Sequence, residues 1–377
     1  MSKTYRFVLA VAGASVALSG CSSTNNGGAP SEPTSEQDAS FATEFSVHGG
    51  LAELDNVDTE PKDPVLIHMV DFDQASAAAD IPALSPDSTP EEIRSWAEAV
   101  GSGQSGAGIS VTTPEFLSSV LADPEAISEE FGWSFGAVDR YSEAAVGSER
   151  FTVLAGQVSW PEGLPEVAPG VKTVGEGDDY ASNPDSASRL RITGRPLRVG
   201  ERDGLAAASW GTPPLEEWVD GAYQSFADSA GLEAAAESLD SHDVFSATLA
   251  QRSFGIETLA GMQGTPETLE KLSEEAVDEP FSIVGTGLTA TEDGLNHVIV
   301  YVFDSPEVAS AAQPQLETIW TTKTSSSLGT NFSEIVDSPV FEQDGQVVMI
   351  TAAVSDSAPP QLFTGVLFNG DLAFLHD

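Results

Sequence analysis

The chain has 377 residues, of which 59 are acidic and 15 are basic, so its formal net charge is −44. This composition excludes a nucleic-acid-binding role, because contact with a phosphate backbone requires a cluster of Lys and Arg. Hydrophobic residues make up 40% of the chain and aromatic residues 8%, which is enough to build a core and more than a disordered acidic chain contains. We therefore expect a folded protein.

The acidic surface has two explanations from the sequence. The like charges repel one another, and salt weakens this repulsion because the Debye length falls to about 3 Å near 1 M. Adaptation to a saline habitat would explain the scarcity of lysine, and so would ordinary solubility. The single cysteine, Cys21, cannot form an intramolecular disulfide, so the fold must depend on core packing.

The first 20 residues have the features of a signal peptide. Lys3 and Arg6 precede the apolar run from Phe7 to Leu18, which is shorter than the roughly 20 residues of a membrane-spanning helix. The run ends in Leu18-Ser19-Gly20-Cys21, which resembles the lipobox of bacterial lipoproteins. An ordinary secreted protein with a cysteine near its cleavage site is the alternative.

The lipobox resemblance implies that the signal peptide is removed and that Cys21 carries fatty chains such as palmitate. Stable anchoring requires at least two such chains, which a diacylglyceryl cysteine with an added acyl group provides. Residues 21–46 are polar and rich in Ser, Gly and Pro, and a flexible tether of about 20 residues spans roughly 25 Å. The sequence thus predicts a protein anchored to the extracytoplasmic side of the cell membrane, with the membrane as its one identifiable partner.

Helix starts are predicted where a capping residue precedes Pro and Glu. The capping oxygen accepts a backbone N–H, proline fixes φ, and glutamate suits the positive end of the helix. These glutamates are therefore expected to stabilise helices rather than to catalyse. The pattern occurs at Thr89-Pro90-Glu91-Glu92, Thr113-Pro114-Glu115, Asp123-Pro124-Glu125, Thr265-Pro266-Glu267 and Ser305-Pro306-Glu307.

Strands are predicted at 65–70, 151–154, 298–303 and 346–351, with a hairpin turn at Asp344-Gly345. The mixture of hairpins and helices favours an α+β fold. The strand near Val65 and the strand near Val298 each lead into an Ala-rich helix, which suggests two similar α+β units of antiparallel sheet behind the tether. We place the two domains at 47–240 and 241–377, and we expect a long loop at 163–188.

The body of the chain resembles a diffuse set of uncharacterised actinobacterial lipoproteins. The resemblance lies in the lipobox, in the strand followed by an Ala-rich helix, in Phe131-Gly132-Trp133 before Val138-Asp139, and in the run 151–156. It implies no known activity.

No segment predicts a catalytic, cofactor-binding or metal-binding residue, and we expect no cofactor. Gly101 to Gly106 matches G-x-G-x-x-G but follows a helix instead of a strand, which favours a loop. The acidic pairs at 71–73 and 176–179 lack the EF-hand pattern. The histidines lie far apart in sequence, at His48, His68, His242, His297 and His376, and the tryptophans are expected to pack in the core.

The sequence therefore favours a lipid-anchored binding or interaction module without catalysis. One alternative is a cell-envelope hydrolase, which would need two carboxyls in one cleft with a raised pKa, about 5–10 Å apart. Another is a lipid-carrying protein, which would have a large apolar cavity.

Overall fold

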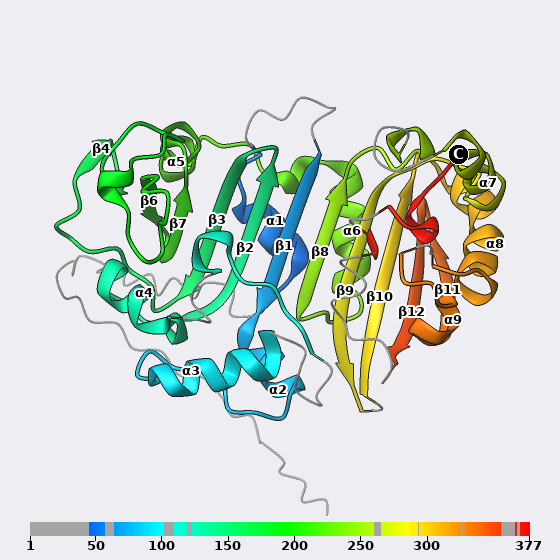
Figure 1. Ribbon diagram of the computed structural model, residues 1–377, viewed down its shortest axis with the longest axis horizontal. Coiled ribbons are helices and arrows are strands. Elements are labelled where there is room, and N and C mark those ends of the chain that lie inside the picture. The colour runs from blue at the N-terminus through cyan, green and yellow to red at the C-terminus, as the bar shows by residue number, and fades with distance from the viewer. Residues whose placement is uncertain are drawn as a thin grey trace, which may run out of the picture. The chain divides into compact units, whose positions relative to one another are not determined.

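The computed structural model describes residues 45–56, 64–101, 109–118, 123–259, 265–292, 294–325, 327–355, 366–367 and 370–377. Ala42–Asp377 form one compact unit, whose centre is a twelve-stranded antiparallel sheet (Figure 1). The α+β prediction is confirmed. The sheet order is β11-β12-β10-β9-β8-β1-β2-β3-β7-β6-β5-β4.

The strands are β1 Val65–Asp71, β2 Val138–Val146, β3 Glu149–Gly156, β4 Glu166–Ala168, β5 Val171–Val174, β6 Leu197–Arg202, β7 Leu205–Ser209, β8 Ser246–Gln251, β9 Phe281–Thr291, β10 Gly294–Phe303, β11 Val336–Asp344 and β12 Val347–Val354. The α-helices are α1 Val47–Glu53, α2 Phe72–Ala78, α3 Pro90–Trp96, α4 Pro124–Phe131, α5 Thr212–Asp220, α6 Ala230–Asp240, α7 Pro266–Glu275, α8 Pro306–Thr322 and α9 Phe332–Ile335. Short helices are η1 Ala97–Gly101, η2 Glu115–Leu117, η3 Phe135–Ala137, η4 Pro184–Ser186, η5 Phe226–Asp228, η6 Ile256–Leu259 and η7 Leu372–Phe374.

The sheet consists of two halves with the same strand order. From the centre outward, the first half runs β1-β2-β3-β7-β6 and the second half runs β8-β9-β10-β12-β11. The halves meet where β1 pairs antiparallel with β8, and β4 and β5 extend only the first half. The expected boundary at 240–241 thus separates two halves of one sheet rather than two compact units, because the backbone hydrogen bonds continue across the centre.

The sequence echo between the regions near Val65 and Val298 does not match this arrangement. Val65 lies in β1, the innermost strand of its half, whereas Val298 lies in β10, the third strand of the other half. The strand equivalent to β1 by position is β8. Ala-rich helices after a buried strand look alike in sequence whatever place the strand takes in the sheet.

The two faces of the sheet are covered differently. Because side chains alternate across a strand, Ile67 and Met69 of β1 face the layer of α1, α5 and α6, where one core contains residues from both halves, including Leu249 and Val300. In Figure 1, α1 and α6 lie behind the strands. The opposite face carries two separate clusters, one around Phe72, Trp96 and Phe135 and the other around Tyr301, Trp320 and Phe374.

Helices begin at four of the five predicted starts, and the prediction at Thr113 is wrong. Thr89 forms a capping box with Glu92, Ser305 caps α8, and α7 begins at Pro266. Asp123 precedes α4 but makes no capping bond, because its carboxylate pairs with Arg189 instead. Thr113 begins no α-helix, since only the short η2 follows.

Two further expectations change. The segment 163–188, expected to be a loop, contains β4, β5 and η4, because its few β-branched residues pair with β6 and extend the sheet. Phe45 and Ser46, assigned to the tether, belong to the folded unit, since Phe45 is buried and Ser46 caps α1. The predicted hairpin at Asp344-Gly345 is confirmed, with Asp344 opposite Val347.

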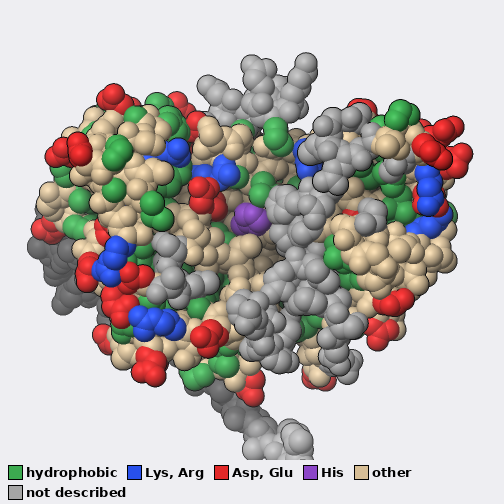
Figure 2. All heavy atoms as spheres, in the orientation of Figure 1, with side chains coloured by type: hydrophobic (Ala, Val, Ile, Leu, Met, Phe, Trp, Pro, Cys, Tyr) green, Lys and Arg blue, Asp and Glu red, His purple; other side chains and the backbone are tan. Residues whose placement is uncertain are grey.

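All six tryptophans are buried, as expected. The surface in Figure 2 carries acidic side chains around its periphery and few basic ones. Among the helices that the structure describes, none has the length and apolar character needed to cross a bilayer.

Candidate functional site

An open groove with a volume of about 900 Å³ lies between α6 and the β11–β12 hairpin. Polar and apolar side chains both line it, the apolar ones being Ala234, Pro306, Val347 and Met349. The helix side contributes Glu237, Ser238, Ser241 and His242, and the hairpin side contributes Glu342, Gln343, Asp344, Gln346 and Met349.

The groove lies beside the place where the described chain begins. Asp240, the last residue of α6, accepts hydrogen bonds from the backbone N–H of Val47 at 2.6 Å and of His48 at 3.0 Å. These bonds satisfy two of the donors that a helix N-terminus leaves unpaired. The start of α1 is thereby fixed to the helix that forms one wall of the groove.

Ser241 and His242 in this groove do not form an activated nucleophile. Ser241 Oγ donates to the carbonyl of Ser238 at 2.7 Å and lies 2.9 Å from His242 Nδ1. Because the hydroxyl proton is used on Ser238, Nδ1 must be the donor in the second contact, and a donating nitrogen cannot accept the serine proton. The groove offers hydrogen-bonding groups and carboxylates, which suit binding.

A second polar site crosses the opposite face of the sheet. His68 of β1 stands opposite Glu143 of β2 and Thr248 of β8, Glu143 stands opposite Thr152 of β3, and Thr248 stands opposite Thr286 of β9. Directly opposed residues share a face, so these five side chains form a row between the two separate hydrophobic clusters. We call it the central polar row.

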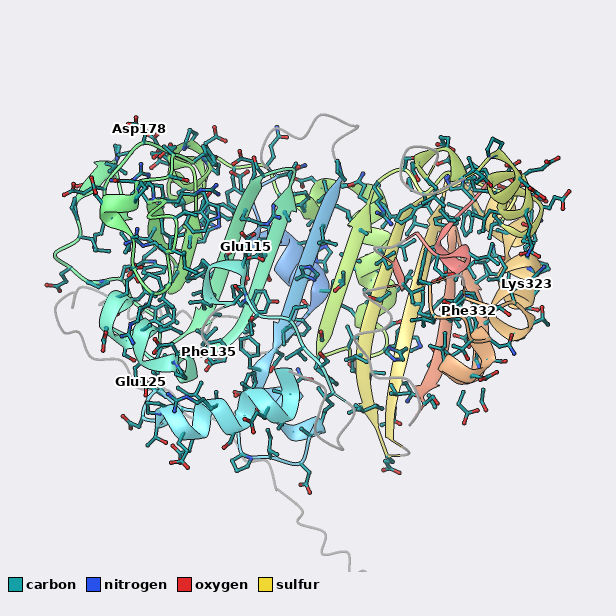
Figure 3. All side chains as sticks on the ribbon, viewed as in Figure 1. Glu115, Glu125, Phe135, Asp178, Lys323 and Phe332 are labelled. Atoms are coloured by element: carbon teal, nitrogen blue, oxygen red, sulfur yellow. The ribbon has the colours of Figure 1, made fainter. Side chains whose placement is uncertain are left out.

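Glu143 is the carboxyl of this row, and its pKa is shifted upward. It is 5% exposed and accepts hydrogen bonds from Thr152 Oγ1 at 2.7 Å and from the backbone N–H of Glu115. Burial raises the pKa of Glu143 to about 7, although these hydrogen bonds favour the charged form. Figure 3 shows Glu115 lying over β2 and β3, where its own carboxylate pairs with Arg150 at 2.6 Å.

His68 is held neutral over the physiological range. Its Nδ1 lies 3.0 Å from Thr248 Oγ1, and burial, together with the positive charge of Arg150, lowers the pKa of His68 to about 4. Between about pH 4 and pH 7, His68 and Glu143 are therefore both uncharged, so this pair across β1 and β2 is a neutral contact.

The cavity beside Glu143 and Glu115 bears on the hydrolase alternative. Glu115, Glu143, Arg150, Thr152 and Trp210 line it, but its volume is only about 10 Å³, which is about the space of one water molecule. A raised pKa next to an ionised carboxylate is the electrostatic pattern of an acid catalyst. Without room for a substrate, the pattern does not support catalysis here.

The acidic pairs noted in the sequence have structural partners. Asp71 caps α2 by accepting from the Gln74 backbone N–H at 2.8 Å, and Asp179 binds Arg198 Nε at 2.6 Å and the Thr212 N–H at 2.8 Å. Asp178, at the edge of the molecule in Figure 3, is exposed. Within the described ranges, no group of three or more potential ligands is arranged to hold a metal ion.

The histidines are spread over the fold, with His48 in α1, His68 in β1, His242 after α6, His297 in β10 and His376 near the C-terminus. Cys21 and most of the 101–106 glycine segment fall outside the described residues; Gly101 itself ends η1. Sequence reasoning missed Glu143 and the groove. A glutamate directly before the apolar run Ala144–Val146 was the available signal for the first, and nothing local indicated the second.

The fold and these sites define an α+β protein built on one twelve-stranded antiparallel sheet. No known protein family matches the sequence, and no curated protein resembles it. Among solved structures, crystal form I of TP0453 aligns with a TM-score of 0.35 and 9% identity, covering 86% of this chain and 99% of that chain. Crystal form III of TP0453 gives 0.32 and 10%, with coverages of 86% and 100%. Likeness at this level carries no conclusion about this chain.

Proposed function

We propose that the protein is a lipid-anchored extracytoplasmic binding module that uses the groove between α6 and the β11–β12 hairpin. The observation that carries the anchor is Leu18-Ser19-Gly20-Cys21 directly after a charged and apolar leader. The observation that supports binding is an open groove of about 900 Å³ whose walls combine polar and apolar side chains, which falls in the size range of small-molecule sites.

The anchor is tested by fractionating bacteria that express the full chain or Cys21→Ser, with Ser23→Ala as the matched control outside the lipobox. We expect the wild type and the control in the membrane fraction with a diacylglyceryl mass on the N-terminal peptide, and the Cys21→Ser chain without that mass. Equal release of all three chains into the medium would refute the anchor.

Binding in the groove is tested separately by native mass spectrometry of the full chain. Ser238 is half-buried on the groove wall, so Ser238→Trp should fill the groove, whereas Ser238→Ala should leave it open. We expect a co-purified or added small molecule to bind the wild type and Ser238→Ala and to be lost from Ser238→Trp. Ligand binding that Ser238→Trp leaves unchanged would place the site elsewhere.

The alternatives receive less support. The carboxyl with a raised pKa lacks space for a substrate. A lipid carrier would need a large apolar cavity, whereas the groove walls carry three carboxylates, from Glu237, Glu342 and Asp344.

A further inference from the structure

Among the residues that the structure describes, Arg252 has no carboxylate partner, whereas most of the arginines there have one. Among the described residues, seven arginines form ion pairs with Asp or Glu: Arg94, Arg140, Arg150, Arg189, Arg191, Arg198 and Arg202. Arg252 and Arg195 are the described arginines without such a pair, and Arg195 lies over the Trp210 ring. Acidic residues outnumber basic ones by 59 to 15, so a shortage of carboxylates does not explain why Arg252 has no ion pair there.

The position of Arg252 follows from β8. Its backbone N–H donates to Ser282 O at 3.1 Å, so the strand alternation continues one residue past Gln251. Arg252 therefore lies on the same face as Thr248 and Ala250, which is the face of the central polar row. Its guanidinium stacks 4.9 Å from the centre of the Phe254 ring.

The guanidinium has donors left over. Within the described part of the chain, the Arg252 side chain makes one hydrogen bond, from Nη2 to Leu367 O at 2.6 Å. Its Nε is buried and has no hydrogen-bond partner. A guanidinium has five N–H donors and keeps its charge at every physiological pH. Burial without a counter-charge lowers the pKa of Arg252, but not far enough to neutralise it.

Arg198 shows what a purely structural arginine looks like in this protein. Its Nε, Nη1 and Nη2 bind Asp179, Thr173 and Gly177 at 2.6, 2.5 and 2.8 Å. A buried N–H without an acceptor costs about 1–3 kcal/mol, and more when the group is charged. Within the described residues, Arg252 lacks the acceptors that Arg198 has, which leaves its donors available to a ligand.

The immediate surroundings of Arg252 favour an anion. On its face of the sheet the neighbouring positions of β1 and β8 are Leu66, His68, Thr248 and Ala250, and His68 is uncharged above about pH 4. These positions carry no carboxylate. A local positive charge on a protein of net charge −44 attracts anions that the rest of the surface repels.

We propose that Arg252 is the anion-recognising residue of a binding site for a small-molecule oxyanion, a carboxylate or a phosphate. The planar fork of a guanidinium matches the two oxygens of either group. This site lies on the sheet face opposite to α6, so it is distinct from the groove and does not depend on the proposed function.

The test uses the full chain labelled with ¹⁵N-arginine and titrated with sodium phosphate, sodium acetate or sodium octanoate, with NaCl keeping the ionic strength constant. We expect a saturable shift of the Arg252 Nε–Hε resonance, and a rise in melting temperature of about 2 °C at a tenfold excess over Kd. Tighter binding of octanoate than of acetate identifies an amphiphile, and equal binding identifies a free ion. The absence of a saturable shift with all three anions overturns the proposal.

Variants identify the residue responsible. Arg252→Gln should lose the response, whereas Arg94→Gln, which removes a half-exposed arginine paired with Glu125, should keep it. If Arg252→Gln fails to fold, Arg252→Lys keeps the charge without the fork and should bind about tenfold more weakly. A response of either Arg252 variant equal to that of the wild type overturns the proposal.

Discussion

The two halves of the sheet have the same strand order but differ in their ion pairs. The first half carries the extra segment with β4 and β5, and buried ion pairs hold it, including Arg191 with Glu130 and Arg198 with Asp179. Aromatic side chains pack in both halves, and in the second half Trp320 Nε1 donates to Tyr301 Oη and Tyr301 donates to Ala373 O. A segment rich in Gly, Asp and Ser has little apolar surface to bury, so directed polar contacts fix it instead.

The largest expected effect is in the first half. Arg198→Ala leaves Asp179 without its ion-pair partner in a site where the Arg198 side chain is 5% exposed, so we expect a loss of about 3–5 kcal/mol in the free energy of unfolding. Urea denaturation measures it. Arg189→Ala, at a pair whose arginine side chain is 51% exposed, is the matched control and should cost at most about 1 kcal/mol. Equal losses for both variants would contradict the role of burial.

The second prediction concerns the core shared by the two halves. Ile67 is fully buried opposite Leu249 of the other half, so Ile67→Ala should cost about 3 kcal/mol through lost contacts and a cavity. Hydrogen exchange should increase by a similar factor in core strands of both halves, because one core spans them. Increased exchange confined to residues before 241 would instead indicate two independently stable domains.

The third prediction uses pH. The folded pKa of Glu143, about 7, exceeds its ordinary value of 4.5, so its contribution to stability is fully present below pH 4.5 and is lost as the pH rises through about 7. The loss is at most about 3 kcal/mol. Glu143→Gln should therefore become more stable relative to the wild type between pH 5 and pH 8 in urea denaturation. A constant difference across that range would argue against a protonated Glu143.

His68, in the same row, contributes a pH dependence of stability that is opposite to that of Glu143. Its folded pKa, about 4, lies below the ordinary 6.5, so its contribution is present above pH 6.5 and is lost as the pH falls toward 4. The two groups together favour the folded state most between the ordinary pKa values of Glu143 and His68, 4.5 and 6.5.

The smallest effect is expected in the second half. Tyr301→Phe removes the hydroxyl that bridges Trp320 and Ala373 within the aromatic cluster, and it leaves a buried indole N–H and a carbonyl without that partner. We expect a cost of about 1–2 kcal/mol, measured by thermal unfolding. No change in stability would show that packing alone holds this half.

Local structure could be predicted where the determining contacts lie close in sequence. Thr89 and Glu92 are three residues apart and form the predicted capping box, and Asp344-Gly345 turns the predicted hairpin because Gly345 adopts a φ of 52°. The missing α-helix after Thr113 and the missing capping bond of Asp123 have a different origin. The Glu115 backbone binds Glu143, and Asp123 binds Arg189, partners that are distant in sequence.

The sequence by itself determined the acidic composition, the lipobox pattern at Cys21, the α+β class and the positions of the main strands, because these depend on residue type and short-range periodicity. Tertiary structure decided which strands are neighbours, and thereby every feature of the candidate sites. His68 meets Thr248 across 180 residues, burial in the folded chain raises the pKa of Glu143, and Arg252 has no carboxylate partner among the residues that the structure describes. Burial and long-range pairing depend on the whole fold, so no local pattern encodes them.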